Sequence, residues 1–215
     1  IKIFTVLLFT LLSAVVIFAL RFKGEKGKRL PLLCFAYFFV AGIGYMGVEV
    51  GLIAKVELFV GNPLYAVAVI LAVFLLSNAC GAFLQDKYRV MRGWKTLLAL
   101  TSLAVIWSVV AATFCNMNLL SIPMVAKVAA VAVAVAPAGV CLGMYYPFGV
   151  ATLVGKGHES MVPATYAIAT LSSVVGSSVA MTAITNIGFS TVILIGAICY
   201  AAVAFVYVAA RKFAL

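Results

Sequence analysis

One acidic side chain lies deep within an apolar stretch of this sequence, and that position makes it the strongest candidate for chemistry. Glu49 is followed by Val-Gly-Leu-Ile and preceded by almost entirely apolar residues. An ionised carboxylate in the membrane interior costs about 2.5–3.5 kcal/mol on insertion scales, so such a group pairs, is protonated or lines a polar cavity. Glu49 is therefore either a structural carboxyl satisfied by hydrogen bonds or a group for proton coupling or cation binding.

Few other polar side chains could meet Glu49 inside an apolar bundle. The intramembrane candidates are Tyr65, Asn78, Lys127 and the hydroxyl side chains of residues 163–184. Lys127 stands near the start of an apolar run, so its ammonium can also reach the membrane surface while its stem stays in lipid. We expect Lys55 to lie at the outer surface of the membrane.

Other kinds of active site lack the residues they need. His158 is the only histidine, and the five cysteines are scattered singly, so neither a zinc site nor haem ligation is predicted, and no cofactor is expected. Residues 42–47 match the Gly-x-Gly-x-x-Gly nucleotide fingerprint, but they lie within an apolar run, whereas the fingerprint acts at a strand-to-helix turn. No nucleophile with a base can be assembled, which makes a catalytic role the least favoured.

The elements that position these residues are predicted to be membrane helices. Hydrophobic residues make up 67% of the chain and charged residues 9%, with a mean hydropathy of +1.26. That composition excludes an ordinary soluble domain. Apolar runs long enough to cross a membrane recur at 3–20, 31–54, 64–84, 96–115, 124–149, 163–184 and 189–210. We predict an all-α polytopic bundle of about seven spans: a leading transmembrane helix within 1–20 and a six-helix bundle within 31–215.

The basic residues are distributed unevenly between the two sides of this bundle. Twelve of the 15 lie in the 21–29 loop, the 86–95 loop, the Lys156 loop and the 211–212 tail, which alternate connections place on one side. Short cytoplasmic loops are enriched in Lys and Arg. The sequence thus predicts a multi-pass protein of the cell inner (plasma) membrane with a cytoplasmic C-terminus. The net charge of +10 reflects topology, and we expect no nucleic-acid partner.

This orientation predicts the result of a labelling experiment. In a background free of native cysteines, single cysteines placed at Lys26 and Met91 should react with an impermeant thiol reagent only from the cytoplasmic side. Labelling of position 91 from outside would reverse the orientation. Labelling of the two positions from opposite sides would change the number of spans between them.

Small residues mark the predicted packing faces, because close backbone approach is what associates helices in lipid. Gly47 and Gly51 form a Gly-x-x-x-Gly step, and Ser172, Gly176 and Ala180 form a ladder four residues apart. Pro137 predicts a kink in the 124–149 span. Turn and packing roles are assigned to Asn62, Pro63, Gly143, Pro147 and Gly176, with Asn62 capping the helix that Pro63 begins.

Several of these segments resemble a known family. They are Glu-Val-Gly-Leu-Ile at 49–53, Gly-Asn-Pro-Leu-Tyr-Ala at 61–66, Ser-Asn-Ala-Cys-Gly at 77–81, Gly-Met-Tyr-Tyr-Pro-Phe-Gly at 143–149 and Ser-Val-Val-Gly-Ser at 173–177. Together they are similar to the membrane helices of spermidine-synthase-like membrane proteins. The resemblance implies a bundle like half of a major-facilitator transporter, joined to an aminopropyltransferase-like or methyltransferase-like Rossmann domain. No such domain occurs within these 215 residues, so any catalytic residues would lie outside them.

The family pattern departs from this chain at one polar position. Tyr-Ala-Ile-Ala occupies 166–169, where the family has Trp-Gly-Ile-Asn, so an indole and an amide are replaced. Two functions are weighed above catalysis. The first is a helical membrane module that anchors or serves a partner domain or complex. The second is half of a small-solute or cation transporter with Glu49 as its carboxylate. The expected partners are the lipid bilayer and another membrane subunit, a second half or a second copy.

Overall fold

The computed structural model describes residues 32–90, 93–114 and 123–212, together with positions 6, 10, 13 and 14. No strand occurs in these ranges, whose helices are α2 (Leu32–Val60), α3 (Pro63–Tyr88), α4 (Trp94–Phe114), α5 (Met124–Gly143), α6 (Tyr145–Gly155), the 3-10 helix η2 (Glu159–Met161), α7 (Val162–Ile187) and α8 (Phe189–Lys212). Six segments in this part of the chain are long and apolar enough to cross a membrane, with α5 and α6 forming one of them. The all-α, multi-pass prediction is therefore confirmed. The span expected at 3–20 lies outside the described ranges except for the four separate positions.

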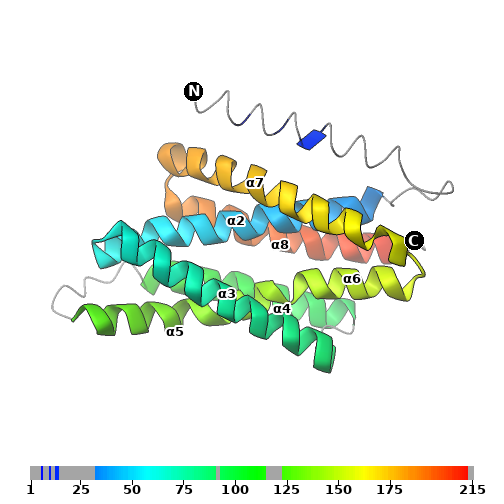
Figure 1. Cartoon of the computed structure of the whole chain (residues 1–215), viewed down its shortest axis with the longest axis horizontal. Helices are drawn as coiled ribbons and strands as arrows, with labels where there is room; N and C mark the ends of the chain where they lie inside the picture. The colour runs from blue at the N-terminus through cyan, green and yellow to red at the C-terminus, as the bar shows by residue number, and fades with distance from the viewer. Residues whose placement is uncertain are drawn as a thin grey trace.

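The helices run roughly parallel or antiparallel to one another along the long axis of the molecule (Figure 1). One end carries the α2–α3 and α7–α8 turns and is called the Gly61 end. The opposite end carries the α6–α7 connection and is called the Lys156 end. Of the predicted cytoplasmic segments, the described parts of the 86–95 loop, the Lys156 loop and the end of α8 lie at the Lys156 end.

Helix α2 begins close to its predicted start but continues past the predicted end at residue 54. It runs to Val60 and stops before Gly61, whose φ of 78° favours glycine. No proline or glycine interrupts residues 55–60, so the helix has no local reason to end earlier. The extension includes Lys55, whose side chain is only 3% exposed within the bundle.

The next helix begins with the expected cap. The Asn62 side chain accepts hydrogen bonds from the backbone N–H groups of Leu64 and Tyr65, at 3.0 and 3.4 Å, and Pro63 occupies the first turn of α3. Asparagine at this position satisfies donors that the helix leaves unpaired, and proline there loses no helical hydrogen bond.

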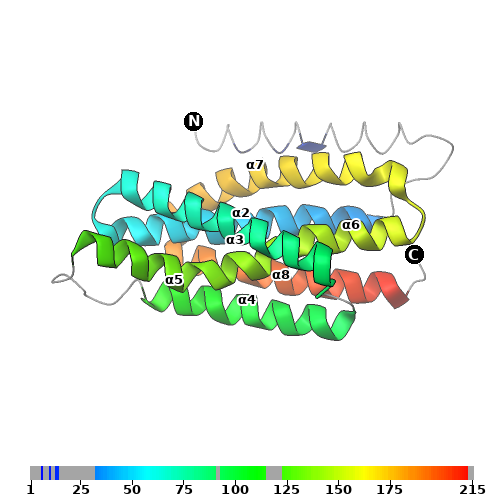
Figure 2. The same cartoon turned by 60° about the horizontal axis from the view of Figure 1, so that its bottom comes forward.

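The six spans fall into two sets of three with matching contacts. Helix α2 packs on α7 and α8, whereas α5 packs on α3 and α4, and α4 also packs on α8. If α2, α3 and α4 are paired with α5–α6, α7 and α8 in that order, the contacts of α2 with α7 and α8 correspond to those of α5 with α3 and α4. The contact between α4 and α8 corresponds to itself. Figure 2 shows α7 along one edge of the described bundle and α4 along the opposite edge. Helices α3 and α7 make no contact with each other within the described ranges.

Glycine residues bring the paired helices together. A Cβ at Gly176 would lie 2.9 Å from the Ile43 Cα atom of α2, and a Cβ at Gly47 would lie 3.1 Å from the Gly196 Cα atom of α8. On the other side of the bundle, a Cβ at Gly139 would lie 2.7 Å from the Ser77 Cβ atom. These contacts place the backbones close enough for van der Waals packing to hold the helices together in lipid.

The fourth membrane segment is interrupted near its middle. Helix α5 passes through Pro137 and ends at Gly143, and α6 starts at Tyr145 after a turn at Met144. The interruption therefore lies beyond the kink expected at Pro137. Pro147 lacks the N–H group that would bond to the Gly143 carbonyl, which weakens the helix at this point.

Candidate functional site

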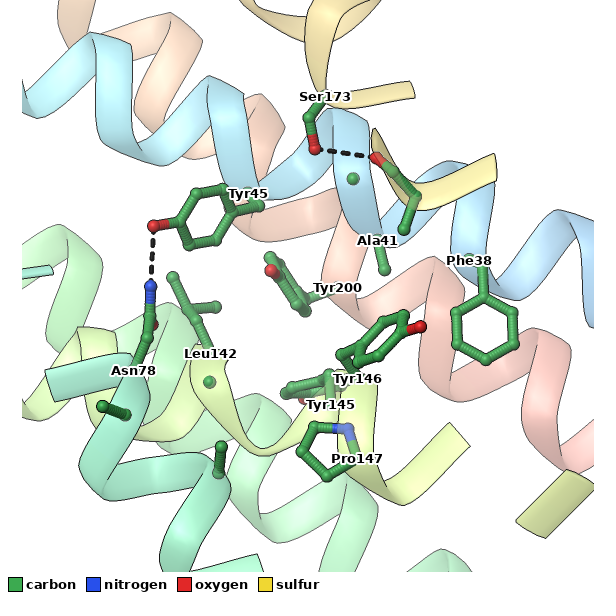
Figure 3. Close-up of a pocket in the computed structure, with 15 residues that line it drawn as sticks. Phe38, Ala41, Tyr45, Asn78, Leu142, Tyr145, Tyr146, Pro147, Ser173 and Tyr200 are labelled. Atoms are coloured by element: carbon green, nitrogen blue, oxygen red, sulfur yellow. Dashed lines mark hydrogen bonds between the residues drawn. The ribbon is translucent and has the colours of Figure 1, made fainter. Parts of the chain in front are cut away.

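A cavity of about 390 Å³ lies beside the interruption between α5 and α6 (Figure 3). Both three-helix sets contribute to its walls. They include residues of α3 and of α7, two helices that do not contact each other. The lining is mainly aromatic and small, and it comprises Phe38, Ala41, Gly42, Tyr45, Asn78, Ala79, Ala82, Leu142, Gly143, Tyr145, Tyr146, Pro147, Ala169, Ser173 and Tyr200. Most of these residues lie near the middle of their membrane segments, so the cavity is at mid-depth in the bundle.

Two polar side chains of the cavity wall are joined close to the buried carboxyl. The Asn78 amide nitrogen donates to the Tyr45 hydroxyl at 2.6 Å, and both residues line the cavity. Glu49 lies one helical turn beyond Tyr45 on α2 and is only 5% exposed. The buried carboxyl is therefore close along α2 to the polar part of the cavity wall.

The amide of Asn78 has an unused acceptor. Its Oδ1 atom is buried and has no hydrogen-bond partner. A buried acceptor without a partner loses hydration and gains nothing in exchange, at a cost of about 1–3 kcal/mol. Asn78 lines the cavity, but this oxygen is inaccessible to water and therefore lies behind the cavity wall.

Tyr145 fixes the geometry at the helix interruption. Its backbone carbonyl accepts a hydrogen bond from the Tyr37 hydroxyl at 2.8 Å, and its own hydroxyl lies 2.5 Å from the Thr101 hydroxyl. The Tyr145 ring meets the Tyr200 ring edge-on, with centroids 4.6 Å apart. These contacts join α2, α4 and α8 to the first residue of α6, so the interruption is held in place by three other helices.

Gly143 and Pro147, both assigned turn or packing roles, lie on the cavity wall. A Cβ at Gly143 would come within 2.6 Å of the Asn78 Cα atom, so glycine is what lets α5 meet α3 there. Gly176 lies outside the cavity, on the contact between α7 and α2.

The two remaining polar candidates lie away from Glu49. Tyr65 is 53% exposed in the first turn of α3, and Lys127 is half-buried at the Gly61 end with its Nζ atom 5.8 Å from the Phe59 ring centre. Of the predicted partners of Glu49, Asn78 is bonded to Tyr45 one helical turn before the carboxyl, and Tyr65 and Lys127 lie elsewhere.

A buried lysine also escaped the sequence reasoning. The Lys55 ammonium donates to the Ser190 hydroxyl at 2.8 Å and lies 4.9 Å from the Phe189 ring centre. These contacts tie the end of α2 to the start of α8. Burial of Lys55 thus has a structural explanation at the Gly61 end, apart from the cavity.

No protein-family model matches the chain, and no curated protein or solved structure matches it. The geometry of the cavity therefore carries the functional argument. Across the described ranges, no group of three or more His, Cys, Asp or Glu side chains is arranged to hold a metal ion.

The sequence reasoning also overlooked the tyrosines of the cavity. Tyr45, Tyr145, Tyr146 and Tyr200 lie near the middle of apolar segments, whereas tyrosine is usually enriched at membrane surfaces. Their position near the middle of each span was the feature of the sequence that could have identified them. That they meet at one cavity could not be predicted from the sequence, because they come from three separate segments.

Proposed function

We propose that this chain is the solute-binding half of a membrane transporter, a six-helix bundle that works against a second half. The observation that carries the proposal is the mid-depth cavity beside the interrupted α5–α6 segment. Secondary transporters commonly bind substrate near the bilayer midplane, beside helices that are broken at the site. Met144 keeps right-handed helical backbone angles, so the interruption is a local loss of regular helical hydrogen bonding next to Pro147, at a place where the segment lines the cavity.

The arrangement of the helices supports this proposal. Helices α3 and α7 each contain 26 residues and carry proline in the first turn, yet they start from opposite ends of the bundle. Together with the exchangeable contacts of the two three-helix sets, this is the pattern of an inverted repeat. Three-plus-three inverted repeats build each half of major-facilitator transporters.

A route from the Lys156 end to the central cavity also fits transport. A second cavity of about 810 Å³ lies between the end of α3 and α6, and Pro147 lines both cavities. A solute arriving from the Lys156 end would thus meet the central cavity at the helix interruption. A second half would cover the side of the cavity between α3 and α7.

A second function rests on the segments that resemble spermidine-synthase-like membrane proteins. In this alternative the bundle is a membrane module that serves a Rossmann-type domain on the same or another chain. Purification of the full-length gene product from native membranes distinguishes the two. A second six-helix set, on the chain or co-purified with it, favours transport, whereas a Rossmann-type domain favours the module.

The transport proposal predicts that water reaches the cavity. In a cysteine-free background, Ala79→Cys on the cavity wall should react with a small hydrophilic thiol reagent at least about tenfold faster than Leu75→Cys, because the reactive thiolate needs water. Leu75 is a matched control on the same helix, one turn away and 67% exposed on the bundle surface. Equal and slow labelling of both positions would show that the cavity is closed to solutes.

A further inference from the structure

We infer that the larger cavity, at the Lys156 end, binds an anionic phospholipid, with its headgroup at Lys87 and Arg89 and its acyl chains against α6. This inference goes beyond the proposed solute-binding function and does not depend on it. It follows from two cations on one side of this cavity, from the apolar wall on the other side and from the position of the cavity at the end of a membrane bundle.

The polar side of the larger cavity is formed by the end of α3. Residues 85–89, which are the last turn of this helix and its cap, all line the cavity, and they include the exposed cations Lys87 and Arg89. Arg89 caps the helix in the left-handed conformation, with a φ of 48°, and its N–H donates to the Gln85 carbonyl at 2.9 Å. The backbone of Arg89 is therefore held at the cavity, and a ligand has only its side chain to order.

Neither cation is neutralised by an ion pair in the part of the chain that the structure describes. Asp86 also lines the cavity, but no ion pair joins it to Lys87 or Arg89. The Lys87 ammonium lies 5.4 Å from the Phe83 ring centre and 5.5 Å from the Tyr88 ring centre. Such ring contacts attract the ammonium but leave its charge in place. Both cations can therefore bind a phosphate group, for which Lys and Arg are the usual protein partners.

The opposite wall of the cavity is apolar and belongs to a membrane segment. Helix α6 contributes Pro147, Val150, Ala151 and Val154, which lie three or four residues apart and so share one face of the helix. Ala151 and Val154 are exposed, so no described helix covers this end of the face. From Pro147 to Val154 the wall is about 10 Å long, which suits the first part of an acyl chain.

The position of the cavity favours a lipid over a soluble anion. It lies at the Lys156 end, where Lys156 directly follows α6 and α8 ends at Lys212. This is the end predicted to be cytoplasmic, and basic pockets between membrane helices on that side bind anionic headgroups. A soluble anion would contact the cations only, whereas a phospholipid would contact both the cations and the apolar wall.

The size of the cavity agrees with this occupant. Its volume of about 810 Å³ is within the range of cavities that hold whole ligands, and it can take a headgroup with the adjoining part of the chains. Because Pro147 lines both cavities, a bound lipid would occupy part of the solute route proposed from this end. Lipid binding and solute access therefore need separate measurements.

The test uses the purified full-length protein in detergent and three probes. Dioleoylphosphatidylglycerol is compared with dioleoylphosphatidylcholine, which has the same acyl chains and no net charge, and with inorganic phosphate. Binding is measured by native mass spectrometry and by the rise in melting temperature. We expect the anionic lipid to bind at least about tenfold more tightly than the zwitterionic lipid, and we expect inorganic phosphate not to displace it.

Variants then locate the binding in the cavity. Lys87→Gln and Arg89→Gln should each weaken binding of the anionic lipid about fivefold, and Ala151→Phe, which fills the apolar side, about tenfold or more. Lys95→Gln and Ala72→Phe are matched controls that should change binding less than about twofold. Both control positions are exposed and lie outside the cavity lining, Lys95 at the same end of the bundle and Ala72 on α3.

Three results would overturn the inference. Equal binding of the two lipids would show that the cations do not recognise the headgroup. Displacement of the anionic lipid by inorganic phosphate would assign the cations to a soluble anion. Weaker binding in Lys87→Gln and Arg89→Gln with normal binding in Ala151→Phe would place the lipid on the charged surface outside the cavity. The labelling of Ala79→Cys is unaffected by all three results, so the proposed function is tested independently.

Discussion

Glu49→Gln is expected to abolish solute transport by the assembled protein while leaving the melting temperature of the bundle nearly unchanged. Glutamine keeps the length of the side chain and a hydrogen-bonding oxygen, so the packing around this buried position can persist. It removes the titratable carboxyl. Uptake by vesicles that contain the full-length protein and a thermal melt in detergent measure the two effects separately.

Glu49→Leu should damage the fold as well as transport. Leucine cannot form hydrogen bonds, and a buried polar partner left unpaired costs about 1–3 kcal/mol. Glu57→Gln is the matched control, because Glu57 is an exposed acid on the same helix. Unchanged transport in Glu49→Gln would restrict the carboxyl to a structural role. A Glu49→Leu protein with normal stability and transport would exclude both roles.

Gly143→Leu is expected to abolish most of the folded, monodisperse protein. Any side chain at this position would enter the backbone of α3, because a Cβ would lie 2.6 Å from both the Cα atom and the carbonyl oxygen of Asn78. Overpacking usually costs about 1–3 kcal/mol, and occasionally more, when a rigid neighbour must move. Backbone atoms of a helix are such a neighbour, so relief requires α3 and α5 to separate.

Size-exclusion profiles and melting temperatures in detergent measure this effect. Gly155→Leu provides the matched control, since it makes the same substitution at the end of α6, where a Cβ would meet nothing within 4 Å. Comparable yields and melting temperatures for Gly143→Leu and Gly155→Leu would show that the close approach at Asn78 is not needed for folding.

Helix positions could be predicted from the sequence because crossing a membrane is a local property of the chain. About 20 consecutive apolar residues suffice to span the hydrocarbon, whatever their neighbours are. The predicted span at 163–184 corresponds to α7 at Val162–Ile187, and the cap at Asn62 follows from residues directly after it. The burial of Lys55 was missed because its partner, Ser190, lies far along the chain.

The partners of Glu49 show where local reasoning stops. The sequence offered Tyr65, Asn78 and Lys127 on equal terms, since each is a polar residue in or near an apolar span. Which of them comes close depends on helix rotation and on which helices are neighbours. Tyr45, one turn before Glu49, bonds to Asn78 because α2 and α3 pack against each other.

By itself the sequence determined that this protein is an all-α membrane protein, where its described membrane segments begin to within two residues, and that Glu49 is a carboxyl inside a span. These properties depend on hydrophobicity, helix caps and breakers, which act over a few turns of chain. Only the tertiary structure decided that α5 and α6 are interrupted at a cavity and that its tyrosines converge there. Helices in lipid associate through specific close contacts such as Gly143 with Asn78, and those contacts join residues that are distant in sequence.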